Sequence, residues 1–123
     1  MTTPHIHSIS PFLGVDDLAA SLAFYRDGLG FALAWEWGSP AEMAAVCRDE
    51  VELTLVTRSD AKPGGISRLY LHMDAVDSYH AQLQAAAVAI TVAIGDRPYG
   101  MRDFSVTDPA GNVLSFGQPL SQA

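Results

Sequence analysis

The chain has 123 residues, 49% of them hydrophobic, which is enough for one domain with a packed core. Acidic residues outnumber basic ones by 14 to 7, and the net charge of −7 argues against binding to the phosphate backbone of nucleic acids. No apolar run approaches the roughly 20 residues of a membrane span, and the first residues lack the pattern of a signal peptide, so we expect a cytoplasmic protein without membrane contacts. The single cysteine, Cys47, excludes an intrachain disulfide.

The first half of the chain predicts one helix within a series of strands. An apolar strand is expected near residues 6–14. Asp16 or Asp17 can then cap a helix that ends near Gly28 or Gly30. Further strands are expected at residues 31–37, 42–48 and 51–57.

The second half repeats this order after a polar, Gly- and Pro-rich linker at about residues 59–66. A strand at 67–73 is expected to precede a helix over 74–87, in which apolar residues recur at helical spacing. A strand at 88–93 follows, and the last two strands flank the turn Asp108-Pro109-Ala110-Gly111-Asn112, where glycine or asparagine tolerates a positive φ. Each half thus reads β-α-β-β-β, which indicates an α+β fold rather than a doubly wound sheet.

Motifs from both halves give the chain a family likeness. Phe24-Tyr25 stands before Leu29-Gly30-Phe31, the segment 51–55 is apolar with Glu52 in it, and Asp108-Pro109-Ala110-Gly111-Asn112 joins the last two strands. With these motifs the chain resembles the vicinal oxygen chelate superfamily of glyoxalases, bleomycin-resistance proteins and dioxygenases. The segments around Tyr99 and Asn112 are most similar to the bleomycin-resistance type.

This resemblance implies a fold and an assembly. We expect a single domain over residues 1–123, built from two tandem βαβββ modules at about 5–58 and 67–120. Their mixed sheets with flanking helices would together form a U-shaped cleft. The resemblance also implies a homodimer whose clefts lie near or across the subunit interface.

Enzymes of this superfamily hold a divalent metal with His, Gln or Glu side chains from four strands. The resemblance places these positions at Ser10, Glu52, Arg68 and Ser115. Serine is a poor ligand, and arginine is not deprotonated near neutral pH, so three of the four residues are not ligand types. This favours a protein with no cofactor, no bound metal and no catalytic residues. Glu52 and Arg68 would then form a charge pair or serve as polar anchors for a ligand.

Aromatic side chains indicate what the cleft could bind. Trp35 and Trp37 share one face of a strand, because strand side chains alternate. Each aromatic residue could also belong to the core. The candidate ligand-binding residues are Trp35, Trp37, Glu52, Arg68, Tyr70, Tyr99, Met101, Phe104 and Ser115. An acidic protein with an aromatic cleft suits a cationic, aromatic small molecule.

The leading hypothesis is therefore a protein that sequesters a small molecule without chemistry, as bleomycin-resistance proteins do in antibiotic resistance. The alternative is a divalent-metal-dependent glyoxalase-like lyase or dioxygenase, with an atypical ligand set that includes Glu52 and His72. A third reading is an accessory or regulatory domain whose cleft is filled by its own side chains.

Overall fold

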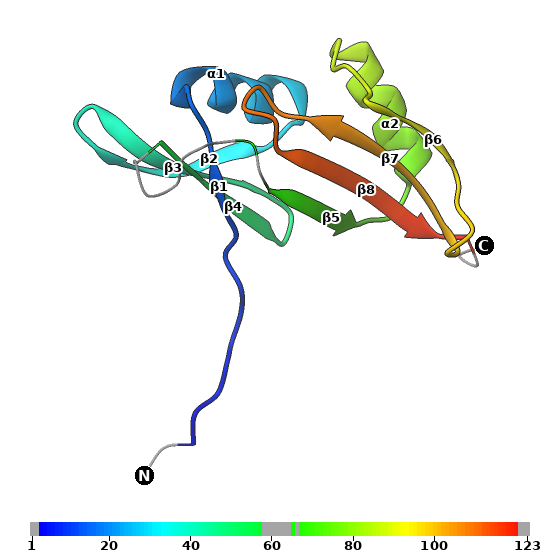
Figure 1. Cartoon of the computed structure of the whole chain (residues 1–123), viewed down its shortest axis with the longest axis horizontal. Helices are drawn as coiled ribbons and strands as arrows, with labels where there is room; N and C mark the ends of the chain where they lie inside the picture. The colour runs from blue at the N-terminus through cyan, green and yellow to red at the C-terminus, as the bar shows by residue number, and fades with distance from the viewer. Residues whose placement is uncertain (1–2, 58–64, 66, 121–123) are drawn as a thin grey trace.

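A computed structural model of the chain describes residues 3–57, 65 and 67–120, and the predicted linker at 59–66 lies outside these residues except for Gly65. Two four-stranded sheets lie side by side, and the helices cover the same side of both (Figure 1). The first module contains β1 (Phe12–Gly14), α1 (Leu18–Ala23) with a π-helical turn η1 (Phe24–Gly28), β2 (Ala32–Gly38), β3 (Ala41–Arg48) and β4 (Val51–Val56). The second contains β5 (Arg68–His72), α2 (Val76–Ala85), β6 (Val92–Asp96), β7 (Met101–Thr107) and β8 (Val113–Pro119).

The two sheets have the same topology. Their strand orders are β1-β4-β3-β2 and β5-β8-β7-β6. The first strand of each module pairs in parallel with the last, and the other pairs are antiparallel. These findings confirm the α+β fold of two βαβββ modules. The sheets are not closed against each other within one chain (Figure 1).

Two predicted strands differ from the structure. Only residues 12–14 of the first expected strand pair with a neighbour, and Ile6 and Ile9 before them are 91% and 86% exposed. The strand expected at 88–93 lies further along the chain: β6 spans Val92–Asp96. Val88 and Ile90 are apolar because they pack against the core from the loop after α2, and not because they alternate along a strand.

The first helix begins as predicted. The Asp17 side chain caps α1 by accepting a hydrogen bond of 3.1 Å from the backbone N–H of Ala20. None of the helices in the described part of the chain is long and apolar enough to cross a membrane.

One hydrophobic core extends through both modules, between the helices and the sheets. Alternate residues of the central strands enter it, because the helix-facing side of each sheet is apolar. Its members include Leu13, Tyr25, Leu29, Val46, Leu53, Leu55, Tyr79, Leu83, Phe104, Leu114 and Phe116. Burial of these side chains is the main stabilising contribution to the fold.

The turn between β7 and β8 ties the modules together. Asp108 Oδ1 accepts three backbone N–H groups of the turn at 2.9–3.0 Å, and Gly111 provides the positive φ of 107° that the turn requires. Asp108 Oδ2 accepts the Tyr25 hydroxyl at 2.9 Å, and Asn112 donates to the Gly14 carbonyl at 2.9 Å. Burial, and then the nearby Asp108 carboxylate, raises the pKa of Tyr25, so its hydroxyl stays protonated as a donor. The motif that marks the family likeness is therefore a structural joint.

Candidate functional site

The side of each sheet opposite the helices, here called the open face, carries most of the predicted ligand-binding residues. On the first sheet, Trp35 lies opposite Ala45, whereas the next residue along β3, Val46, belongs to the core. Trp35 and Trp37 thus share the open face, with 40% and 60% of their surface exposed. They form part of a hollow of about 290 Å³ whose lining also includes Met43. Large exposed aromatic surfaces of this kind are typical of a binding site.

Glu52 lies on the same open face. It pairs with Cys47 in the register of β3 and β4, two residues from Thr54, which lies opposite Ala45. The side chain is exposed at the start of β4. Arg68 lies in the other sheet, and the described residues include no ion pair between the two, so one chain alone does not form the expected charge pair.

The second sheet presents a more polar open face. Tyr70 lies opposite Ser115, and Ser115 lies opposite Ser105, so these three residues form a row across β5, β8 and β7. Arg68 and His72 share the parity of Tyr70, and the rings of Tyr70 and His72 are 5.1 Å apart. Predicted residues from β5 and β8 therefore do lie on one face.

Phe104 lies on the opposite side. It is fully buried beneath α2, with its ring centroid 6.3 Å from that of Tyr79 and 5.5 Å from that of Phe116. Met101 is three residues away on the same strand and therefore faces the open side with Asp103. Phe104 is a core residue and is not accessible to a ligand on the open face.

A buried carboxylate that the sequence analysis missed organises this face. Asp103, only 4% exposed, accepts hydrogen bonds on Oδ2 from the hydroxyls of Tyr70 at 2.8 Å and Tyr99 at 2.6 Å. Its Oδ1 pairs with Arg97 Nε at 2.7 Å. Burial opposes ionisation, but the hydrogen bonds from these donors outweigh it and lower the pKa of Asp103. The ionised Asp103 thus fixes two phenol rings in place.

Gly117 makes this cluster possible. The hydroxyl of Tyr70 occupies the space that a Cβ atom at position 117 would fill, and Asp103 borders the same space. Burial, and then the hydrogen bond to Asp103, raises the pKa of Tyr70, so its hydroxyl remains a donor. Tyr70 and Tyr99 are nevertheless 39% and 65% exposed, which leaves ring surface available for stacking.

The four positions at which superfamily enzymes hold a metal do not fit one here. Ser115 forms a hydrogen bond of 2.6 Å with Ser105, and Ser10 is exposed ahead of β1. Glu52 is the single carboxylate of the set. Within the described ranges, no group of three or more His, Cys, Asp or Glu side chains is placed to hold a metal ion. The donor chemistry of these residues therefore does not match a divalent metal centre.

Comparisons with known proteins agree with this fold. The family model described as Glyoxalase/Bleomycin resistance protein/Dioxygenase superfamily matches residues 4–116. A bleomycin resistance protein of Geobacillus stearothermophilus is 28% identical over 134 residues, covering 89% of this chain and 95% of the relative.

Two solved structures are also similar. TnmS3, an antibiotic binding protein from Streptomyces sp. CB03234, is 30% identical with a TM-score of 0.81, covering 96% of this chain and 99% of the other. The bleomycin-binding protein of Streptomyces verticillus, in complex with copper(II)-bleomycin, has a TM-score of 0.74 at 24% identity, covering 93% of this chain and 97% of the other. At 24% identity, the similarity to the Streptomyces verticillus protein is evidence for a shared fold alone.

Proposed function

Because this chain belongs to the glyoxalase/bleomycin resistance protein/dioxygenase superfamily, we propose that it captures a small molecule on its open face without transforming it. The observation that supports the proposal is that this face lacks metal ligands but exposes aromatic side chains. The positions that would hold a metal are Ser10, Arg68 and Ser115 beside a lone Glu52, whereas large aromatic side chains are exposed. Family membership alone would not decide this, since the family includes both enzymes and binding proteins.

We further propose that two copies pair through their open faces and enclose the ligand between them. Residues 3–10 extend away from the sheets, on the side opposite the helices (Figure 1). Exposed apolar surface of this kind often marks an interface with another protein. Exposed apolar side chains of the arm and the strands include Ile6, Ile9, Phe12, Trp35, Trp37, Tyr70 and Tyr99. A second copy would cover these side chains, and the open faces of the two copies would together form the cleft.

The chemistry of this face favours a cationic, aromatic ligand. Trp35, Trp37, Tyr70 and Tyr99 offer ring faces on which a flat molecule can stack or a cation can rest. The net charge of −7 attracts a positively charged ligand to the protein, and Glu52 is an exposed carboxylate on the same face. TnmS3 and the Streptomyces verticillus protein, whose names describe antibiotic binding and bleomycin binding, are consistent with such a ligand.

A titration with copper(II)-bleomycin tests the proposal, with benzoate as an anionic aromatic control. We expect tryptophan fluorescence to be quenched to a plateau at one ligand per subunit, and chromatography to recover the ligand chemically unchanged. The exhaustively dialysed protein should not bind one equivalent of Ni, Zn, Mn or Fe(II) tightly. Tight stoichiometric metal binding, or a modified ligand, would show that the protein is a metalloenzyme instead.

A further inference from the structure

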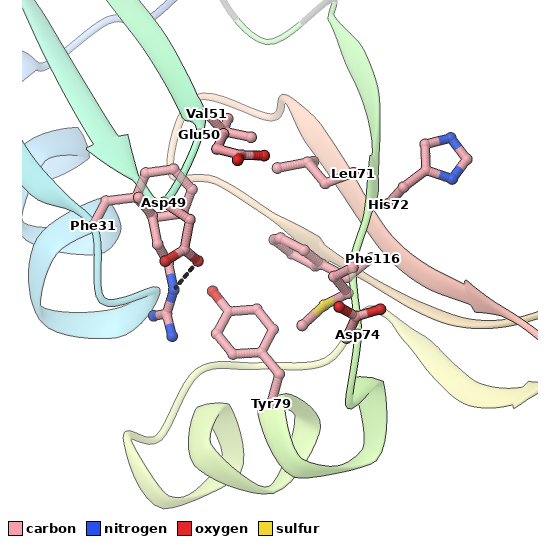
Figure 2. A pocket seen from close by; sticks show the side chains of 11 residues that line it. Phe31, Asp49, Glu50, Val51, Leu71, His72, Asp74, Tyr79 and Phe116 are labelled. Atoms are coloured by element: carbon pink, nitrogen blue, oxygen red, sulfur yellow. Dashed lines mark ion pairs between the residues drawn. The ribbon is translucent and has the colours of Figure 1, made fainter. Parts of the chain in front are cut away.

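A second hollow lies away from the open face, where the two modules meet. This junction cavity of about 370 Å³ opens between the β3–β4 turn, the end of β5 and α2 (Figure 2). Its floor consists of the core residues Phe31, Tyr79 and Phe116, each no more than 5% exposed. A cavity of this volume is large enough for a small organic molecule, and its floor is apolar and aromatic.

The mouth of the junction cavity is acidic. Asp49 and Glu50 come from the β3–β4 turn, and Asp74 comes from the loop after β5. Arg48 also lines the cavity, so its lining contains three carboxylate groups and one guanidinium group. Neither Glu50 nor Asp74 forms an ion pair with the described residues. The mouth therefore carries an excess of negative charge above an apolar floor.

Arg48 shows how this cavity accommodates a cation. Its guanidinium carbon lies 4.9 Å from the centroid of the Tyr79 ring, and Nη1 donates to the Leu29 carbonyl at 3.0 Å. The Tyr79 hydroxyl donates to the same carbonyl at 2.7 Å. Burial raises the pKa of Tyr79 to about 12, with Arg48 opposing the shift, so the ring stays neutral. These contacts hold Arg48 in one wall of the cavity, away from the carboxylates of Glu50 and Asp74 at its mouth.

We propose that the junction cavity binds a small organic cation, a protonated amine on an aromatic or branched aliphatic body. The body would lie against the more accessible apolar side chains of Val51, Leu71 and Met73, above the buried rings. The ammonium group would point outward to Glu50 and Asp74. An anion would be repelled by the carboxylates. A metal ion is a poor match, because no described group of three or more His, Cys, Asp or Glu is placed to hold one. The site contains none of the tryptophans or tyrosines of the open face, and His72 is the residue of that face that also lines the cavity.

Benzylammonium is a suitable probe, with benzoate as the same ring bearing the opposite charge. In two-dimensional amide NMR of the full chain, we expect saturable shifts at residues 48–51 and 71–74 with benzylammonium, at a dissociation constant of about 1 mM. Benzoate should leave these amides unmoved. Equal shifts with benzoate, no saturable shift at millimolar benzylammonium, or shifts confined to the open face would overturn the proposal.

Charge variants separate the cavity from general attraction to an acidic protein. Glu50→Gln and Asp74→Asn should each weaken benzylammonium binding about threefold, because both carboxylates are exposed to solvent. Asp27→Asn removes an exposed carboxylate that does not line the cavity and should change nothing. The amide spectrum of each variant reports whether it folds. Equal affinity in all three variants would mean that the mouth carboxylates do not hold the amine.

Discussion

The two faces of the second sheet differ although the same strands form both. Toward α2, Phe104, Leu114 and Phe116 are buried together, and their packing is complete within one chain. On the open face, the neighbouring residue Asp103 accepts hydrogen bonds from two exposed tyrosines, and Ser115 is hydrogen-bonded to Ser105. The helix-facing side chains are buried within one chain, whereas the open face leaves aromatic rings exposed to solvent. The comparison indicates that stability and binding depend on different residues of the same strands.

The largest expected effect is on the helix side. Phe104→Ala should lower the free energy of unfolding by about 4 kcal/mol, because it removes a fully buried ring and leaves a cavity. Chemical denaturation followed by circular dichroism measures this. Ser115→Ala, on the open face of the adjacent strand, should cost about 1 kcal/mol through loss of one hydrogen bond. Similar losses in the two variants would contradict the division between the faces.

Next in size is the joint between the modules. Asp108→Ala should lower the free energy of unfolding by about 3 kcal/mol, since the turn's N–H groups and the buried Tyr25 hydroxyl lose their acceptor. Pro109→Ala alters the exposed neighbour in the same turn and is the matched control. If the two variants unfold at the same denaturant concentration, the turn does not join the modules as described.

A smaller and pH-dependent effect is expected at Asp103. Asp103→Asn should cost about 1.5 kcal/mol at pH 7 and weaken ligand capture about tenfold, because the neutral amide offers one acceptor oxygen where the carboxylate serves Tyr70 and Tyr99 with one oxygen and Arg97 with the other. The folded-state pKa of Asp103 lies below its unfolded value, so its contribution is present above about pH 4. That contribution is lost as the pH falls through the folded pKa. Urea unfolding at several pH values should therefore show the difference from wild type shrinking below about pH 4, and a constant difference would argue against an ionised Asp103.

The smallest effect on stability is expected at the exposed tryptophans. Trp37→Ala should change the free energy of unfolding by less than about 0.5 kcal/mol, because the side chain is 60% exposed. The same variant should lose about tenfold in affinity for copper(II)-bleomycin, measured by calorimetry. Leu120→Ala removes another exposed apolar side chain outside the candidate residues and serves as the control. Unchanged affinity in Trp37→Ala would remove the tryptophan hollow from the proposed site.

Local chemistry made much of the fold predictable. Asp17 predicted the start of α1, and the Asp-Pro-Ala-Gly-Asn segment predicted the turn before β8. Both predictions were possible because caps and turns depend on a few adjacent residues. Phe104 was wrongly predicted to bind ligand, although the alternation of residue types along its strand indicates a core position. Asp103, Ser105 and Thr107 alternate with Phe104 and Val106, so the polar residues had to share the face opposite the phenylalanine.

The candidate sites were harder to predict, because they join distant segments. Asp103 meets Tyr70 from another strand and Arg97 from the loop between β6 and β7, and only the folded sheet brings them together. The junction cavity likewise combines Asp49 from one module with Asp74 from the other. The charge and residue types were visible in the sequence, but their neighbours depend on tertiary packing.

Native mass spectrometry of the protein with copper(II)-bleomycin tests the central claim most directly. We expect a complex of twice the 13.1 kDa chain mass that carries ligand of unchanged mass, and much less complex with Asp103→Asn. A ligand of altered mass, or an uncomplexed monomer at all ligand concentrations, would contradict capture between paired open faces.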